Sequence, residues 1–317
     1  MLVLDDGRVA SLLDMREVID SVEKAMAALS SGRAYMPQRT HIHTSLGDIL
    51  TMNALVEELG VHTTKIVSVY PGNPEKGLPT INAVIVALDS STGTPIALMD
   101  AGTLTAVRTG AASAVATKYL SSKNAETLAM IGCGVQARYQ AYAISLVRHL
   151  RKIKVYCRRR WRAEKYAEEV GGRLGVDVEV SDSPREALKN AEIIVTATTS
   201  KAPVIRREWV GEGAHINAIG SYRPDARELD TETIIDGKVV VDFREAALSE
   251  AGDIIIPIRE GRYSPDKIYA ELGEIILGAK PGRTREDEIT IFKSVGLAVQ
   301  DAAAAYVVLR RLGVIKG

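Results

Sequence analysis

Three cationic residues stand where a small domain would not need them. Arg39 follows Met-Pro-Gln, Lys65 lies in the apolar run 63–69, and Arg108 is flanked by small apolar residues. A buried ammonium or guanidinium group is costly unless it is paired or functional. Together the three predict a clamp for a substrate carboxylate, with Lys65 supplying or accepting a proton beside an imine or amine carbon. Each by itself also has a structural interpretation, as an edge-strand lysine or a helix arginine in an ion pair.

A second group of residues is suited to hold a dinucleotide. The segment 130–137, Met-Ile-Gly-Cys-Gly-Val-Gln-Ala, has G-x-G-x-x-A spacing between an apolar run and a helical pattern. Gly132 permits a tight strand-to-helix turn, Gly134 lets the backbone approach a pyrophosphate, and Ala137 allows close helix packing. A purely structural turn is the alternative. The strand–helix alternation that follows favours dinucleotide binding.

The end of the second strand of such a unit selects the dinucleotide. An acidic residue there binds the ribose hydroxyls of NAD, but this chain has Cys-Arg-Arg-Arg at 157–160. A guanidinium group pairs with a 2′-phosphate and cannot accept a hydrogen bond from a hydroxyl. NADP(H) is therefore favoured, with Arg158 and Arg159 as the contacts, and NAD(H) stays possible. The alternative is that these arginines are a solvated helix start.

The first hundred residues predict a sheet with one helix before it. A strand at 2–4 and a turn at Asp6-Gly7 precede an amphipathic helix over 15–29, with Asp14 as its N-cap and Gly32 as its stop. Short β-type runs then alternate with turn residues, at 41–44, 49–55, 63–69, 81–88 and 94–99. They predict a largely antiparallel or mixed sheet with a long ordered loop at 70–79.

The remainder predicts an α/β fold with a Rossmann doubly wound parallel sheet. After an Ala-rich helix at 100–120, solid apolar runs at 127–131, 153–157, 176–180, 193–198, 214–219 and 238–243 alternate with helical segments. A final helix over 289–312 resembles the one at 100–120 in composition. We therefore expect a split α+β domain for substrate binding and dimerisation, 1–121 with 294–317, around a dinucleotide-binding domain, 122–293.

Composition excludes several classes of function. The 317 residues include 40 Lys+Arg and 40 Asp+Glu, so the net charge is zero and a general affinity for nucleic acid is not expected. No apolar stretch approaches the roughly 20 residues that span a bilayer, so no membrane association is expected. The two cysteines, Cys133 and Cys157, predict no disulfide framework, and the cytoplasm is the expected compartment.

One histidine pair has a spacing that metals use. His41 and His43 lie on one face of an expected strand. Because the sequence shows no further His/Cys cluster nearby, a structural role is favoured and no metal is expected.

Five motifs occur in order along nearly the whole chain. They are Lys-Ile-Val-Ser-Val-Tyr-Pro-Gly-Asn-Pro-x-x-Gly-Leu-Pro-Thr (65–80), Leu-Thr-Ala-x-Arg-Thr-Gly-Ala-Ala-Ser (104–113), Ile-Gly-Cys-Gly-Val-Gln-Ala (131–137), His-Ile-Asn-Ala-Ile-Gly (215–220) and Gly-Leu-Ala-Val-Gln-Asp (296–301). With these motifs the sequence resembles the ornithine cyclodeaminase/mu-crystallin family, which includes archaeal-type alanine dehydrogenases and ketimine reductases. The resemblance implies a homodimer with a substrate and dimerisation domain and a Rossmann domain.

The resemblance also implies roles for individual positions. Arg39, Lys65 and Arg108 match substrate-carboxylate and catalytic positions, with Lys65 as the proton donor. Asp301 is implied to face the substrate amine, with a helix-surface carboxylate as the alternative. The matched cofactor contacts are Thr80, Arg108, Thr109, Val135 and Gln136, and further nucleotide or nicotinamide contacts are Thr198, Ala218, Ile219, Gly220 and Ser294.

One departure distinguishes the activities within that family. The cyclodeaminases carry an Asp that assists ring closure where this chain has Tyr222, and Asp225 stands three residues away. The segment Arg-Pro-Asp-Ala-Arg-Glu-Leu at 223–229 resembles the reductase branch instead. We therefore expect an NAD(P)H-dependent oxidoreductase acting at the α-carbon of a small amino, imino or keto acid, either an alanine dehydrogenase or a pyrroline-2-carboxylate or ketimine reductase. The alternatives are an NAD-dependent ornithine cyclodeaminase and a non-catalytic NADP(H)-binding protein.

Overall fold

The computed structural model describes residues 1–315, so the last two residues of the expected 294–317 segment lie outside it. The chain forms two compact units, Met1–Arg108 with Leu297–Gly317, and Thr109–Gly296. These bounds differ from the expected ones because helix α3 (Gly102–Leu120) is divided between the units after Arg108. The assignment of substrate binding to one unit and cofactor binding to the other stays a prediction.

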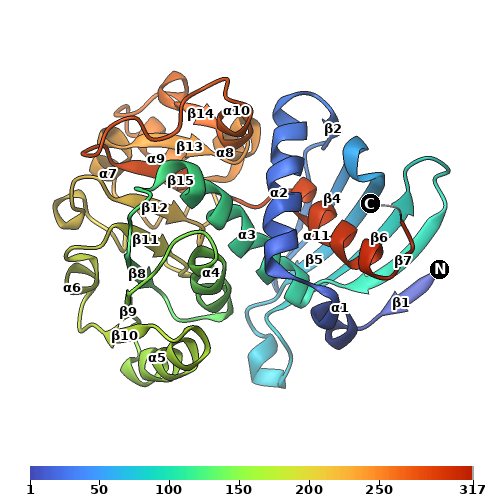
Figure 1. Cartoon of the computed structure of the whole chain (residues 1–317), viewed down its shortest axis with the longest axis horizontal. Helices are drawn as coiled ribbons and strands as arrows, with labels where there is room; N and C mark the ends of the chain where they lie inside the picture. Colours follow the sequence, from blue (N-terminus) through green and yellow to red (C-terminus); the bar gives the residue numbers. More distant parts are fainter. Residues whose placement is uncertain (316–317) are drawn as a thin grey trace. The chain divides into compact units, whose positions relative to one another are not determined.

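The first unit is built on a mixed sheet. Its strands run in the order β1-β7-β6-β5-β4-β2, with β3 paired to β4; β1 is parallel to β7 and the other pairs are antiparallel. Their bounds are β1 Leu2–Leu4, β2 Ala34–Tyr35, β3 Thr40–His43, β4 Asp48–Val56, β5 Val61–Val69, β6 Ile81–Asp89 and β7 Pro95–Asp100. Helices α2 (Met15–Ser30) and α11 (Ala298–Arg311) lie side by side and contact β4, so both ends of the chain cover this sheet (Figure 1).

Local signals explain where these elements begin. Every second residue of β4 is buried, which is the period expected of a strand with one face covered. The carboxylate of Asp14 accepts hydrogen bonds from the backbone N–H groups of Arg16 and Glu17 and so caps α2, as predicted. The turn predicted at Asp6-Gly7 is wrong: a short helix, α1 (Asp6–Leu12), begins there because Asp5 caps it.

The second unit confirms the predicted doubly wound parallel sheet. All its strands are parallel, in the order β10-β9-β8-β11-β12-β15-β13-β14. Their bounds are β8 Thr127–Ile131, β9 Lys152–Tyr156, β10 Asp177–Val180, β11 Ile193–Thr196, β12 His215–Ala218, β13 Lys238–Val241, β14 Ala270–Glu271 and β15 Thr290–Lys293. The helices are α4 Val135–Ser145, α5 Arg160–Leu174, α6 Pro184–Leu188, α7 Thr231–Asp236, α8 Arg244–Glu250, α9 Gly252–Arg259 and α10 Leu272–Ile276.

This sheet carries a core on each face. Successive residues of β11 alternate between two apolar clusters: Ile193 and Val195 pack in one, and Ile194 packs in the other. Helices therefore flank the sheet on both sides (Figure 1). Burial on both faces is the reason that these strands are continuous apolar runs. None of the helices over 1–315 is long and apolar enough to cross a bilayer.

The single helix predicted over 289–312 is wrong in its first third. Thr290–Lys293 is instead strand β15, fully buried between β12 and β13, and α11 begins only at Ala298. Gly296, with a φ of +81°, turns the chain between the two elements. The β-branched and aromatic residues at 290–292 were the available signal for a strand.

Candidate active site

The first unit gathers three of the predicted chemical residues at one point. Lys65 on β5, Arg108 on α3 and Asp301 on α11 are all buried, and they are far apart in the sequence. The Nζ of Lys65 and the Nε of Arg108 each lie 2.9 Å from the same Oδ1 atom of Asp301. Gln300 fixes the arginine further, because its Oε1 accepts a hydrogen bond of 2.9 Å from a terminal nitrogen of Arg108. The helix-surface alternative for Asp301 is therefore wrong.

Each element places its residue by an ordinary local rule. The strand period of two puts Lys65 on the same covered face as Thr63 and Val67. Asp301 lies in the first turn of α11, where the helix dipole stabilises a carboxylate. Since α11 contacts β5, the carboxylate meets the lysine side chain across the interface between helix and sheet.

Burial perturbs the lysine strongly. The pKa of Lys65 is lowered to about 8, mainly by burial; the positive charges of Arg108 and Arg39 add to the lowering, and Asp301 opposes it. One carboxylate faces two cations here, so the cluster keeps a net positive charge. A buried site of this kind attracts an anion and holds a proton that can be given up near neutral pH.

Asp301 retains an unused acceptor. Its Oδ2 atom is buried and accepts no hydrogen bond from the described residues. A buried carboxylate oxygen without a donor is costly, and such an atom in a native structure requires an explanation. An N–H group of a bound molecule would satisfy it.

Arg39 and Thr80 are the other residues of the first unit that the sequence predicts for the site. Arg39 is half-buried and directly precedes β3; its charge is close enough to lower the pKa of Lys65. Thr80 is half-buried, and its carbonyl oxygen accepts the N–H of Tyr70 at 2.8 Å, which closes the 70–79 loop. That loop also contains a short 3-10 helix, Asn73–Lys76.

The glycine loop of the second unit has the geometry that its spacing predicts. Gly132 has a φ of +116°, and a Cβ there would lie 2.4 Å from the carbonyl oxygen of Ala197, so a side chain is excluded. A Cβ on Gly134 would meet nothing within 4 Å, which leaves open space at the N-terminus of α4. Ala137 is fully buried against the sheet. This loop fits the pyrophosphate of a dinucleotide.

The first residues of α4 border that open space. Val135 is exposed, and the side-chain oxygen of Gln136 is buried with no hydrogen-bond partner among the described residues. The N–H groups of a first helical turn have no partner within the helix and suit an anion. Thr109, on α3, is half-buried, and its carbonyl oxygen accepts a hydrogen bond of 3.1 Å from Gln140 of α4.

The arginines after β9 differ in their pairing. Arg160 begins α5 and forms ion pairs with Glu164 and Asp182. Arg158 and Arg159 are exposed and form no ion pair with the described residues. These two side chains, rather than the third, are available to a ligand.

The sequence predicted no disulfide framework, but the structure has one disulfide. Cys133 of the glycine loop and Cys157, directly after β9, form it, with their Cα atoms 5.9 Å apart. The parallel pairing of β8 and β9 brings these two strand ends together, although 24 residues separate them in the sequence. The disulfide therefore joins the loop that suits pyrophosphate to the segment that carries the arginines.

The remaining predicted cofactor contacts lie at the carboxyl ends of the strands. Ala218 is the last residue of β12 and is fully buried; Ile219 and Gly220, which follow it, and Thr198, beyond β11, are half-buried. Ser294 directly follows β15. In a doubly wound sheet this is the edge where ligands bind.

Two buried acids that sequence reasoning missed hold this edge together. Glu228 accepts hydrogen bonds from the backbone N–H groups of Thr198 and Gly220 at 2.8 and 2.7 Å, and from the hydroxyl of Thr198 at 2.7 Å. Asp242 accepts the hydroxyl of Ser294 at 2.8 Å. Burial raises the pKa of both carboxyl groups. The sequence marks Glu228 only by its place in the Arg-Glu-Leu segment, because the burial of a loop acid leaves no local pattern.

The segment that distinguishes the activities offers no free acid. Asp225 forms an exposed ion pair of 3.0 Å with Arg223, and the pair lowers its pKa. Tyr222 packs against the apolar core of the second unit. Neither arrangement aims a carboxylate from this turn at a ligand.

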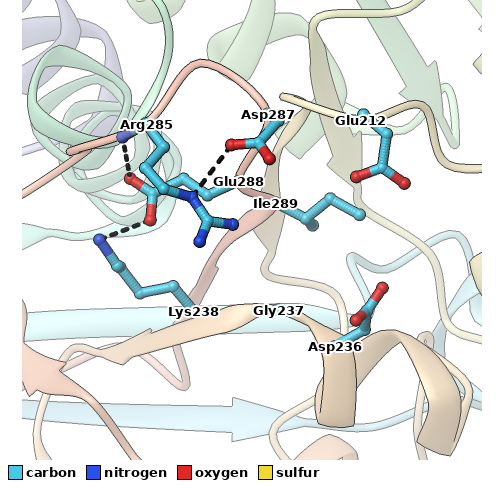
Figure 2. A pocket seen from close by; sticks show the side chains of 8 residues that line it. All are labelled: Glu212, Asp236, Gly237, Lys238, Arg285, Asp287, Glu288 and Ile289. Carbon is cyan, nitrogen blue, oxygen red and sulfur yellow. Dashed lines mark hydrogen bonds and ion pairs between the residues drawn. The ribbon is translucent and has the colours of Figure 1, made fainter.

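A cavity of about 240 Å³ lies at the opposite edge of the same sheet. Figure 2 shows its lining, where Lys238 opens β13 and Ile289 precedes β15. Four of its charged groups form two ion pairs: Lys238 with Glu288 at 2.6 Å, and Arg285 with Asp287 at 3.0 Å. None of the predicted site residues lines this cavity, and we assign it no part in the site.

Comparison with known proteins agrees with this architecture. A family profile described as "Ornithine cyclodeaminase/mu-crystallin family" matches residues 1–313. A Δ1-pyrroline-2-carboxylate reductase of Bacillus cereus is 42% identical over 308 residues, which are 96% of this chain and 94% of the relative. An alanine dehydrogenase of Archaeoglobus fulgidus is 40% identical over 310 residues, 97% of this chain and 94% of the relative.

A solved structure extends the similarity to the fold. The Thermococcus litoralis Δ1-pyrroline-2-carboxylate reductase in complex with NADH and L-proline has a TM-score of 0.95 at 45% identity, covering 98% of this chain and 97% of the other. Both the family profile and these identities extend over almost the entire length of the chain. The protein therefore belongs to the ornithine cyclodeaminase/mu-crystallin family.

Proposed function

We propose that the protein reduces the C=N bond of a small cyclic imine carboxylate, such as Δ1-pyrroline-2-carboxylate, to the corresponding cyclic amino acid. In class, it is an NAD(P)-dependent oxidoreductase of amino and imino acids. The observation that carries the proposal is the buried cluster of Lys65, Arg108 and Asp301, in a chain 45% identical to a reductase bound to NADH and proline.

Each residue of the cluster has a proposed role in the reaction. The guanidinium group of Arg108, assisted by Arg39, binds the substrate carboxylate. Lys65 gives a proton to the imine nitrogen, and solvent later restores it. The unused Oδ2 of Asp301 accepts the N–H group that results.

The cofactor completes the reaction. When bound, the reduced nicotinamide supplies a hydride to the imine carbon, so hydride and proton together balance the reduction. The glycine loop and the N-terminus of α4 would hold its pyrophosphate. Thr80, Thr109, Val135 and Gln136 are the other proposed contacts, with Thr198, Ala218, Ile219, Gly220 and Ser294 for the nicotinamide end.

NADPH is the proposed reductant in preference to NADH. The support is that Arg158 and Arg159 are exposed and form no ion pair with the described residues, while no acid stands at the end of β9. The solved relative holds NADH, so the preference is a property proposed for this chain. The ratio of kcat/KM for NADPH over NADH tests it: the double variant R158A/R159A should lose the preference and keep NADH turnover, whereas an unchanged ratio rejects these contacts.

Alanine dehydrogenase activity is the second candidate, and the 40% identity to the Archaeoglobus enzyme favours it. Pyruvate and ammonia would form the imine that the same residues protonate and reduce. An ornithine cyclodeaminase is disfavoured by Tyr222 and by the ion pair of Asp225. We propose the cytoplasm, where reduced nicotinamide dinucleotides are available, as the compartment.

The test is a panel of substrates and cofactors read by absorbance of the reduced dinucleotide. NADPH and NADH are each offered with Δ1-pyrroline-2-carboxylate or with pyruvate plus ammonium, and ammonia release from ornithine is measured separately. Oxidation of the cofactor with the cyclic imine is expected. Tight cofactor binding without turnover of any substrate would establish the non-catalytic alternative.

Lys65→Met gives the matched control. The variant keeps the length of the side chain, removes the proton, and leaves Asp301 paired with Arg108. Reduction should fall by about 10²–10⁴-fold while NADPH binding, measured by its fluorescence, is retained. Turnover that survives this change would show that the proton comes from elsewhere.

A further inference from the structure

We propose that His41, His43 and Asp48 form a binding site for a divalent transition metal such as Zn²⁺, separate from the proposed reaction. The Nε2 of His41 and the Nδ1 of His43 lie 2.9 and 2.6 Å from the same Oδ1 atom of Asp48. All three donor atoms lie within 4.8 Å of one another. They converge on one point from two strands.

The β3–β4 hairpin presents these side chains together. Antiparallel pairing sets His43 directly opposite Asp48 and His41 opposite Leu50, so both imidazoles stand on the face that carries the carboxylate. The turn is closed by hydrogen bonds from the N–H and the hydroxyl of Thr44 to the carbonyl oxygen of Gly47, at 2.9 and 2.8 Å. The backbone of the hairpin is therefore fixed without the metal.

The donor set selects the class of ion. Two imidazole nitrogens and one carboxylate oxygen suit Zn²⁺, Ni²⁺, Co²⁺ or Cu²⁺, whereas Mg²⁺ and Ca²⁺ prefer oxygen ligands alone. Bonds of 2.0–2.1 Å in a tetrahedron separate donors by about 3.3 Å, a few tenths more than the hydrogen-bonded distances here. The imidazole side chains are 48% and 71% exposed, so they can move outward by that amount and water can fill the fourth position.

The carboxylate is the fixed point of the site. The Asp48 side chain is only 10% exposed, and both imidazoles contact its Oδ1 atom. A bound ion would link β3, a strand of four residues that are all exposed, to the neighbouring β4.

Metal titration of the full chain, without an affinity tag, tests the site. Co²⁺ is added in a non-chelating buffer and its visible absorption is followed, with Zn²⁺ competing, because the spectrum reports ligand geometry independently of enzyme activity. One ion per chain is expected, together with a rise in Tm on adding Zn²⁺. The absence of a stoichiometric spectrum and of any Zn²⁺-dependent rise in Tm overturns the proposal.

Two variants separate this site from adventitious surface binding. His43→Asn should weaken binding by at least about tenfold, because it removes one of three donors. His149→Asn, which alters an exposed histidine outside the hairpin, should leave binding unchanged. Equal binding in wild type and His43→Asn, or equal loss in both variants, rejects the assignment.

Discussion

Lys65 derives its proposed reactivity from a conflict between burial and pairing. Burial in the sheet and the positive charges of two arginines favour the neutral amine of Lys65. The carboxylate of Asp301 favours the protonated ammonium form. An exposed lysine would hold its proton far too tightly to give it up at neutral pH. The pKa of Lys65 is therefore set by the residues packed around it.

The pH dependence of turnover should follow this lysine. Reduction of the imine requires the protonated form, so kcat/KM should fall about tenfold per pH unit above a pKa of about 8. Oxidation of the product requires the neutral amine and should rise to a plateau across the same range. Rate profiles in both directions from pH 6 to 10 measure this, with Lys65→Arg as the control, because a guanidinium group does not titrate there. A break near 8 that persists in the Lys65→Arg variant would assign it to another group.

Glu228 should control cofactor affinity without touching the reacting atoms. Its carboxylate accepts hydrogen bonds from the N–H groups of both Thr198 and Gly220. In Glu228→Gln an NH₂ group replaces one of the two accepting oxygens, so one of these N–H groups loses its acceptor. We expect the dissociation constant for NADPH to rise by about ten- to a hundredfold, a cost of roughly 1–3 kcal/mol in ordering the two loops.

The same substitution at Glu192 is the matched control. Glu192 also accepts two backbone N–H groups, those of Glu126 and Thr127 at 2.9 and 3.0 Å, but at the amino end of β8. Glu192→Gln should affect Tm and leave NADPH affinity within about twofold of wild type. Fluorescence titrations that show the same loss of affinity in both variants would mean that Glu228 acts only on general stability.

At the scale of elements, the sequence predicts the features that depend on neighbouring residues alone. The G-x-G-x-x-A turn, the Asp14 cap and the parallel strands follow from residue type and spacing, and all are present. Lys65 and Arg108 could be singled out because each interrupts an apolar neighbourhood. Strand β15 was merged with the helix after it because four residues are too few to show a period, and only the residue types at 290–292 marked it as a strand.

Contacts between segments that are far apart in the sequence could not be predicted from patterns of neighbouring residues. The sequence left Asp301 open between a site residue and a helix-surface carboxylate, because its partner Lys65 lies 236 positions earlier. Glu228 and Asp242 were missed for the same reason: an acid in a loop is usually solvated, and only the packed sheet edge buries these two. The disulfide likewise depends on the pairing of β8 with β9.

That disulfide gives a prediction about the stability of the second unit. It closes a loop of 24 residues between the glycine turn and the end of β9, and a loop of about that size contributes roughly 3 kcal/mol. Reduction should therefore lower Tm by several degrees, measured by thermal scans with and without a thiol reductant. Cys157→Ser should have the lower Tm already and show no further response. Two titratable thiols in the untreated, unfolded protein would show that the disulfide is absent.

At the scale of the whole molecule, neutrality conceals an uneven distribution of charge. The 40 basic and 40 acidic residues cancel, yet Lys65, Arg108 and Arg39 concentrate positive charge in the first unit. Arg158 and Arg159 do the same after β9 in the second unit. The protein is therefore suited to small anions at particular points rather than to polyanions in general.

One face of the first unit's sheet carries exposed apolar side chains. Ile42, Ile66 and Val84 are 56%, 45% and 39% exposed. Strand register places Ile66 opposite Val84, on the face that points away from Lys65 and from the helices packed over it. Apolar side chains gathered on one face of a sheet are typical of an interface.

We propose that a second copy of the chain covers this face. Light scattering should give twice the monomer mass of 34.2 kDa for the wild type. Ile66→Glu places a charge at the centre of the face and should shift the protein toward monomers, while Ile235→Glu, an exposed isoleucine in the second unit, should not. A dimer that withstands Ile66→Glu at micromolar concentration would locate the interface elsewhere. A wild-type monomer would leave the exposed apolar face without the partner proposed for it.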